Sequence, residues 1–317
     1  MTARHMWLRE RAKRPALGVA LLLLTCGRAH GFARTETADG HAFFWKTSCA
    51  PFTVYLNGFD RSTRSRMTTN EIEKSVVAAA HAWSSDEVLC PTGGSPYLEL
   101  VPTLAADSAT PPAVAWDGRN TVIFRTDSWA ESGSGKAYND GGLALTSVTA
   151  RLDGHIVDVD MEINAVDFTW MNLDPGVPIP GGHTGDVFVY DLQNALTHEF
   201  GHAIGMAHSC FDPNLNPGTP WPTFNGIRVP DCNTASASVM SPTASPGDVN
   251  KRSLTADDVA AVCEAYPPSV TPEACSLDVA TPGCAVAPRR NQRGSRQYGL
   301  YLALAGLASI ALFRRLR

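Results

Sequence analysis

The sequence predicts one α+β domain between two terminal processing segments. Residues 50–56 and 155–164 have the composition and alternation of strands, residues 68–83 repeat apolar side chains at helical spacing, and a second helix that carries closely spaced histidines begins after Asp191. With 317 residues, the chain is long enough to enclose a large core.

The first half of the domain contains a strand, a helix and two more strands. Residues 50–56 (APFTVYL) form the first predicted strand. The helix starts at a capping box, Thr68-x-x-Glu71, in which each side chain satisfies a free backbone N–H. Residues 97–101 and 121–124 are the next predicted strands, linked by residues 102–113. The apolar face of the helix is Ile72, Val76, Ala79, Ala80 and Trp83.

Two further strands follow a glycine turn. Residues 139–142 (NDGG) have turn composition, and residues 143–149 (LALTSVT) leave the turn as a strand. Residues 155–164 (HIVDVDMEIN) alternate apolar residues with Asp158, Asp160 and Glu162. Carboxylates two residues apart repel one another unless they are solvated or share a cation. Two interpretations stay open, a calcium site and a solvated acidic face.

The sequence THEFGHAIGMAHS at residues 197–209 carries the clearest chemical signal. His198 and His202 are four residues apart, so on a helix their imidazoles share one face, with Glu199 beside them. An unbroken helix would turn His208 away from them. A left-handed turn at Gly205 ends the helix and returns His208 to the same ion. Three imidazoles leave one tetrahedral position open, as in catalytic zinc sites.

This pattern, His-Glu-x-x-His-x-x-Gly-x-x-His, resembles that of the metzincin zinc peptidases, and Ser209 after the third histidine is similar to the matrixin branch. The resemblance implies a metzincin fold, which has a twisted mixed sheet with an antiparallel edge strand, an active-site helix, a Met-turn and a C-terminal helix. It also implies peptide-bond hydrolysis, in which zinc on the three histidines activates a water molecule and Glu199 is general base and then general acid.

Other parts of the chain extend the resemblance. Residues 238–242 (SVMSP) resemble the Met-turn, which implies that Met240 lies beneath the zinc without binding it. The resemblance implies that residues 143–149 are the edge strand that binds extended peptides by β-augmentation, and an ordinary edge strand is the alternative that the sequence leaves open. The loop over residues 210–238 corresponds to the region that shapes the substrate pocket, where Trp221 and Phe224 either line the pocket or pack in the core. The resemblance also implies calcium near the acidic strand.

Several features limit what the resemblance implies. The spacing around His155 and His183 does not reproduce the second, structural zinc site of vertebrate matrixins, and both are interpreted as ordinary surface or loop histidines. No cysteine-switch motif is present, so latency would need another source. The catalytic domain is predicted over residues 43–267 and ends with a helix that starts at the capping box of residues 255–258. Residues 268–297 form a linker.

Both termini resemble export signals. Residues 1–31 have a basic start, an apolar run and small residues, as in a secretory signal peptide cleaved after Gly31 or Ala33. Lipoprotein processing at Cys26 is a second interpretation. Residues 298–317 form a short apolar helix with a closing arginine cluster. With Cys284 upstream, this tail resembles the MYXO-CTERM sorting tails of myxobacterial surface proteins; a plain membrane anchor is the alternative.

Export permits disulfides, and six cysteines lie between the signal and the tail. Pairing of nearest neighbours along the chain is predicted. The pairs are Cys49 with Cys90, Cys210 with Cys232, and Cys263 with Cys275.

Charge bears on partners. The formal net charge of the whole chain is −5. Residues 1–31 contain 6 basic and 1 acidic residue, and residues 289–317 contain 7 basic residues. The chain between these two segments therefore has 13 basic and 30 acidic residues. This acidity disfavours nucleic acid as a partner. We therefore expect a monomeric, exported zinc endopeptidase that acts on peptides or proteins and contacts the membrane through its tail. The alternative function is a zinc-containing surface adhesion module without significant peptidase activity.

Overall fold

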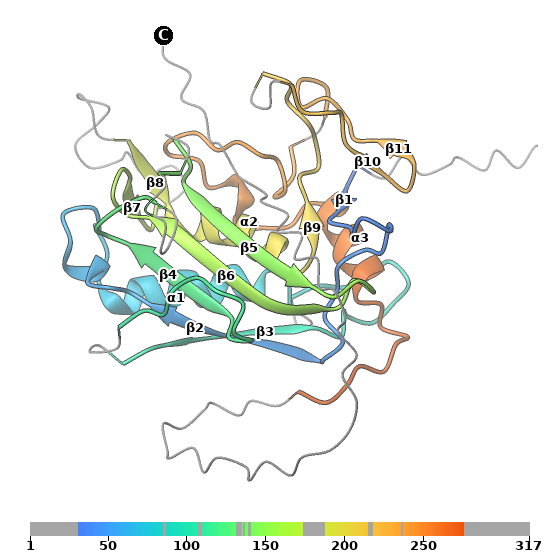
Figure 1. Cartoon of the computed structure of the whole chain (residues 1–317), viewed down its shortest axis with the longest axis horizontal. Helices are drawn as coiled ribbons and strands as arrows, with labels where there is room; N and C mark the ends of the chain where they lie inside the picture. The colour runs from blue at the N-terminus through green and yellow to red at the C-terminus, as the bar shows by residue number, and fades with distance from the viewer. Residues whose placement is uncertain are drawn as a thin grey trace, which may run out of the picture.

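The fold is built on one five-stranded mixed sheet. The structure is a computed structural model, and it describes residues 31–275 except 85–86, 107–109, 131–134, 136, 139–140, 174–187, 215–217 and 236. The strand order is β3-β2-β4-β6-β5, in which all neighbours are parallel except the antiparallel edge strand β5 (Figure 1). The α+β class predicted from the sequence is confirmed. The strands are β2 (Cys49–Tyr55), β3 (Glu99–Leu104), β4 (Thr121–Arg125), β5 (Ala144–Ala150) and β6 (Ile156–Asn164).

The strand β3 extends further than predicted. It includes Pro102, which the sequence predicts to be part of a linker. Because proline has no N–H to donate, it is tolerated only where one side of a strand is unpaired. Pro102 pairs with Phe52 of β2, and β3 lies at the edge of the sheet.

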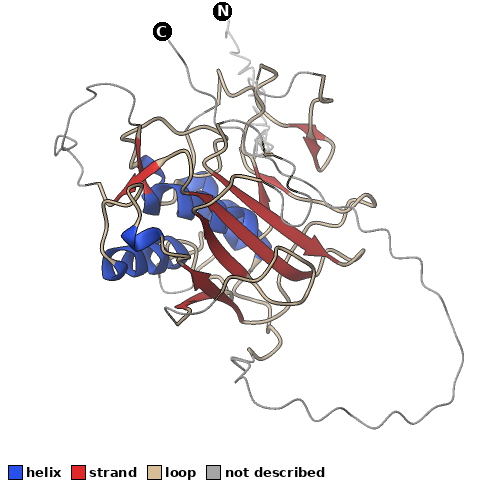
Figure 2. Cartoon of the chain, turned by 60° about the vertical axis from the view of Figure 1, so that its left-hand side comes forward, coloured by secondary structure: helices blue, strands red, loops and turns tan. Residues whose placement is uncertain are grey.

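The helices pack on one side of the sheet (Figure 2). They are α1 (Thr69–His81), α2 (Leu192–Ala203) and α3 (Ala256–Ala265). The predicted capping boxes of α1 and α3 are both present, at Thr68 with Glu71 and at Thr255 with Asp258. The predicted apolar face of α1 is buried, and Phe200 of α2 meets Phe52 of β2 edge to face at 5.4 Å between ring centroids.

Short elements complete the fold. The N-terminal strand β1 pairs with β9, which follows α2. The packed region therefore begins before residue 43, the predicted start of the domain. The elements are β1 (Ala33–Arg34) with β9 (Met206–Ala207), β7 (Thr169–Met171) with β8 (Val189–Asp191), β10 (Thr223–Phe224) with β11 (Ile227–Arg228), η1 (Phe59–Arg61) and η2 (Asn250–Arg252).

The acidic face of β6 is buried, so the solvated-face interpretation is wrong. Asp158, Asp160 and Glu162 are 3%, 4% and 0% exposed. The loop before β4 covers the two aspartates, and its backbone N–H groups donate to them, with 2.7 Å between Gly118 N and Asp158 Oδ1. Arg125 Nε lies 2.6 Å from Glu162 Oε1. All three carboxylates therefore have protein partners, and calcium near them stays a prediction.

The disulfides differ from nearest-neighbour pairing in two cases of three. Cys210 bonds Cys232 as predicted, but the other bridges are Cys49–Cys275 and Cys90–Cys263. The chain after α3 returns beside the start of β2, where Thr47 forms a bridge with Glu273. The tertiary fold therefore brings Cys275 to Cys49, at 5.3 Å between Cα atoms.

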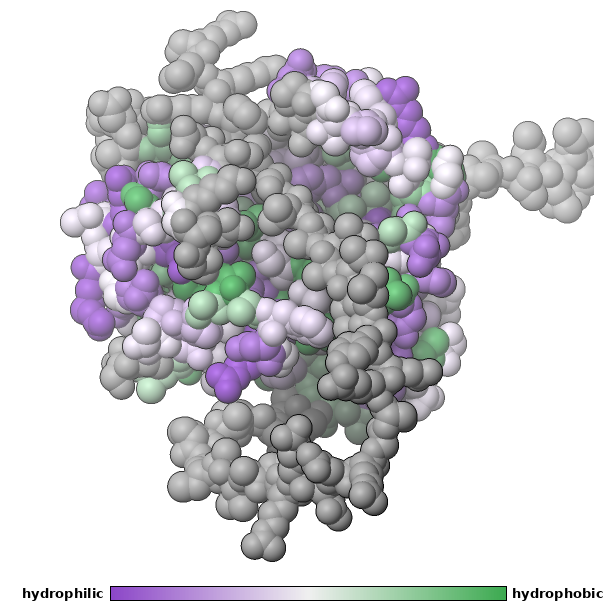
Figure 3. Space-filling view, in the orientation of Figure 1, coloured by the Kyte–Doolittle hydropathy of each residue, from purple (hydrophilic) through white to green (hydrophobic). Residues whose placement is uncertain are grey.

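Polar residues cover much of the described surface on the face that Figure 3 shows. Figure 3 shows scattered apolar residues on one face of the molecule. No helix within the described ranges is long and apolar enough to span a bilayer. Several predicted features lie outside those ranges: residues 1–30 of the signal peptide with Cys26, the Asn139-Asp140 turn, His183, and residues 276–317 with Cys284. The large apolar side chains that are exposed are Leu89, Trp116, Leu152, Ile227 and Val270.

Candidate metal centre

The histidine helix α2 begins where the sequence predicts. Asp191 is the N-cap, and its Oδ1 accepts from the backbone N–H of Asn194 at 2.7 Å. The Asp191 carboxylate also pairs with Arg252 of η2 and accepts from the backbone N–H of Leu173. The start of the helix is therefore fixed to two neighbouring segments.

The end of α2 confirms the predicted glycine turn. The helix stops at Ala203, and Gly205 has φ 89°. A Cβ at Gly205 would lie 2.5 Å from the carbonyl oxygen of Phe43, so space as well as backbone conformation requires glycine here. After the turn, β9 runs back along β1 and brings His208 toward the helix.

Buried side chains donate hydrogen bonds to backbone carbonyl groups of α2 and of its C-cap, and those at the end of the helix have no helical N–H to accept from. Trp83 Nε1 donates to Thr197 O, Trp45 Nε1 to Ala203 O, and Tyr266 Oη to Ile204 O at 2.8 Å. The helical spacing of Trp83 predicts a place in the core but not these bonds, because nothing in the local pattern indicates which carbonyl group a distant tryptophan contacts.

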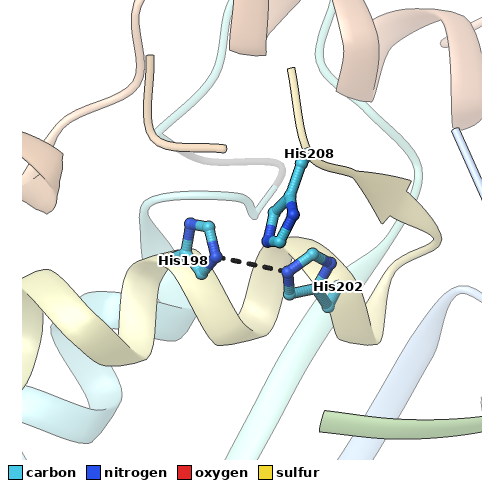
Figure 4. A group of neighbouring side chains, drawn as sticks. All are labelled: His198, His202 and His208. Atoms are coloured by element: carbon cyan, nitrogen blue, oxygen red, sulfur yellow. Dashed lines mark hydrogen bonds between the residues drawn. The ribbon is translucent and has the colours of Figure 1, made fainter. Parts of the chain in front are cut away.

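The three predicted histidines come together. One ring nitrogen from each of His198, His202 and His208 lies within 4.8 Å of the other two. Figure 4 shows the imidazoles of His198 and His202 rising from one side of α2, with His208 reaching them from the returning strand. Within the described residues, this is the one group of three or more His, Cys, Asp or Glu side chains placed to hold a metal ion.

The hydrogen bonds around the rings leave their metal-facing nitrogens unprotonated. His198 Nδ1 lies 2.6 Å from Val239 O, and His202 Nδ1 lies 2.8 Å from Met206 O. Because a carbonyl oxygen can only accept, both Nδ1 atoms carry the proton. Their Nε2 atoms are then unprotonated and lie 3.2 Å apart, with the lone pair of one facing the lone pair of the other. His208 Nε2 is buried without a hydrogen-bond partner. A cation between these nitrogens relieves the repulsion, so the residues fit a metal ion.

Burial supports the same protonation state. It lowers the pKa of His202 to about 4 and holds the pKa values of His198 and His208 well below the usual range. The neighbouring Lys251 charge acts in the same direction. Neutral imidazole is the form that binds metals, so the rings are ready for an ion at neutral pH.

Glu199 lies buried beside the cluster and has one hydroxyl partner. Thr146 of β5 donates to Glu199 Oε2 at 2.6 Å between oxygens. Burial raises the pKa of Glu199 to about 7, while the Thr146 hydrogen bond and the charge of Lys251 act against that rise. A carboxyl group with a pKa near neutrality suits general acid–base chemistry.

Met240 packs against the histidine helix α2, and its place beneath a zinc ion stays a prediction. A Cβ on Gly201 of α2 would be 2.3 Å from Met240 Sδ, which measures how closely the two segments approach. The turn is held from both sides: Ser209 N donates to Met240 O at 3.0 Å, and Val239 N donates to Asp258 Oδ2 at 3.0 Å. The capping carboxylate of α3 therefore also supports the turn whose carbonyl orients His198.

Lys251 is a residue of this site that sequence analysis missed. Its side chain is buried, its Nζ donates to Ser241 O, and Nζ lies 3.4 Å from His198 Nδ1. Burial lowers the pKa of Lys251 to about 8. A single lysine in a short polar stretch carries no sequence signal of burial, so only the folded chain reveals it.

Most described residues of the loop after His208 are exposed, but a few of its side chains pack against the protein. Trp221 Nε1 donates to Val229 O, and the guanidinium of Arg228 stacks over the Trp221 ring at 3.7 Å. Phe224 is buried against Phe32 of the N-terminal segment. His155 is half-buried beside Phe44 and lies outside the histidine cluster.

Comparisons with known proteins add little to this geometry. No protein-family model and no curated protein matches the chain. Among solved structures, the chain is similar to the structure of Myroilysin, at 15% sequence identity, over 71% of this chain and 82% of that chain, with a TM-score of 0.29. A similarity at that TM-score carries no argument, so the candidate metal centre stands on its own residues.

Proposed function

We propose that the chain is a zinc-dependent endopeptidase of the matrixin-like metzincin type. The single observation that carries the proposal is a cluster of three imidazoles, two buried on α2 and one partly buried after its end, with the buried Glu199 carboxylate beside them on α2. An all-imidazole ligand set suits zinc, and three protein ligands are the usual number in catalytic zinc sites. His198, His202 and His208 would hold the ion.

The residues around the metal have distinct roles in this proposal. When bound, zinc supplies Lewis-acid activation of a water molecule and of the scissile carbonyl. Glu199 accepts the proton of the water and delivers it to the departing amine nitrogen, so the carboxylate is regenerated. The edge strand β5 pairs with β6 on one side, and its other edge offers backbone groups to an extended peptide.

The sequence supports the remaining parts of the proposal. The signal-like residues 1–31 favour export, and the apolar tail at residues 298–317 favours attachment to the membrane or release by sorting. Three disulfides favour an oxidising compartment. Calcium binding at the acidic strand and a monomeric state belong to the proposal as well.

A fluorogenic peptide library tests the function directly. We expect the purified ectodomain to cleave internal peptide bonds, to lose activity with a zinc chelator and to regain it with added zinc. The variant Glu199→Gln should keep its zinc and lose turnover by at least about 10³-fold, since it keeps the shape of the side chain but cannot take up a proton. Zinc bound at one equivalent without chelator-sensitive cleavage would instead favour the adhesion module.

A further inference from the structure

The hydrogen bond between Thr146 and Glu199 joins the edge strand to the helix of the candidate metal centre. Both side chains are buried, at 1% and 2% exposure, and their oxygens are 2.6 Å apart. Thr146 lies in β5, whose register pairs it with Met161 of β6. The sheet therefore fixes the position of the hydroxyl before any substrate binds.

The bond distinguishes the two oxygens of the Glu199 carboxylate. A hydroxyl that donates to a carboxylate occupies one acceptor oxygen, here Oε2. Oε1 then has more acceptor capacity free than Oε2, which favours it as the atom that accepts a proton. Hydrogen bonds to an ionised group are short and strong, and a buried one restricts rotation of the carboxylate.

We propose that Thr146 is a positioning residue that holds Glu199 so that Oε1 faces the reacting water. This inference rests on the proposed peptidase function. In the reaction, Oε1 takes one proton from water as the C–O bond forms, and returns it to the amine nitrogen as the C–N bond breaks. Thr146 keeps its own proton throughout.

A purely structural role for the bond makes a different prediction. If the hydroxyl only satisfied a buried carboxylate, its loss would lower stability and leave kcat unchanged. If the hydroxyl positions the base, its loss lowers kcat with little change in KM, because the interaction matters in the transition state and not in peptide binding.

Kinetics of matched variants separate the two roles. Thr146→Val keeps the β-branched shape and removes the hydroxyl, and we expect kcat to fall about 10- to 100-fold with KM within about twofold of wild type. Thr146→Ser restores the hydroxyl and should return kcat to within about threefold. Thr121→Val is the control, since it removes a similar buried bond, from Thr121 to Asp160, on β4 away from the histidines, and should leave kcat unchanged.

A double-mutant cycle on unfolding tests the bond without relying on activity. We expect Thr146→Val and Glu199→Met to be coupled by at least about fivefold in the unfolding equilibrium constant. Coupling below twofold, or a Thr146→Val enzyme with wild-type kcat, would overturn the positioning role. If coupling is present but wild-type protein shows no chelator-sensitive cleavage, it is the peptidase function that fails, and the role of Thr146 in catalysis fails with it.

Discussion

Replacing Gly201 by alanine tests how closely the turn at Met240 supports the metal centre. Gly201 lies in α2 between the first two histidines, and an added Cβ would be 2.3 Å from Met240 Sδ and 2.8 Å from Trp83 Cζ2. Both distances are well below the ordinary van der Waals contact distances of carbon with sulfur and of carbon with carbon. Trp83 is buried and its Nε1 is bonded to Thr197 O, so its ring has little freedom to move.

Two opposing effects decide the sign of this substitution. Alanine in place of glycine inside a helix gains up to about 1 kcal/mol from backbone propensity. Overpacking a close-packed core costs about 1–3 kcal/mol. Since two buried side chains must move, we expect the steric cost to exceed the gain and the free energy of unfolding to fall by about 1–2 kcal/mol.

Urea titration and thermal unfolding of the Gly201→Ala and wild-type proteins measure the change in the free energy of unfolding. For a domain of this size, each kcal/mol corresponds to about 2–4 °C in Tm. The double variant Gly201→Ala/Met240→Ala should lose less than the sum of the single variants, because truncating Met240 removes the nearest atom. A Gly201→Ala protein that is more stable than wild type would refute the reasoning, since propensity alone would then account for the result.

Four further predictions address other parts of the chain. Gly205→Ala should lower the free energy of unfolding by at least about 2 kcal/mol in urea titrations, more than Gly218→Ala, which has similar φ but open space around its Cβ position. His208→Ala should weaken zinc binding more than about 100-fold in chelator competition, whereas His155→Ala should not change it. Burial raises the pKa of Asp160 to about 6, so the folded state binds a proton at this carboxyl group more tightly than the unfolded chain does. The contribution of the protonated Asp160 to stability should therefore fall as pH rises from about 4 to 6. Asp160→Asn should flatten that part of the pH profile of Tm. Non-reducing peptide mapping should link Cys49 to Cys275 and Cys90 to Cys263, and a Cys49–Cys90 peptide would contradict the fold.

The sequence by itself determined the features that depend on local chemistry. Capping residues such as Thr68 and Asp191 act on backbone groups three residues away, so their effect is visible in a short stretch of chain. The glycine turn and the three histidines lie within eleven residues, and helix geometry alone indicates that Gly205 must return His208 to the cluster.

Only the tertiary structure decided which distant segments meet. Cysteine pairing depends on chain ends that the sheet brings together, so proximity in sequence predicted Cys210–Cys232 and failed for Cys49 and Cys90. Alternation correctly placed Asp160 on one face of β6, but the loop that covers this face comes from another part of the chain. Thr146 and Lys251 reach the metal centre from separate elements for the same reason: burial and long-range hydrogen bonds are properties of packing, which periodicity along one strand or helix does not encode.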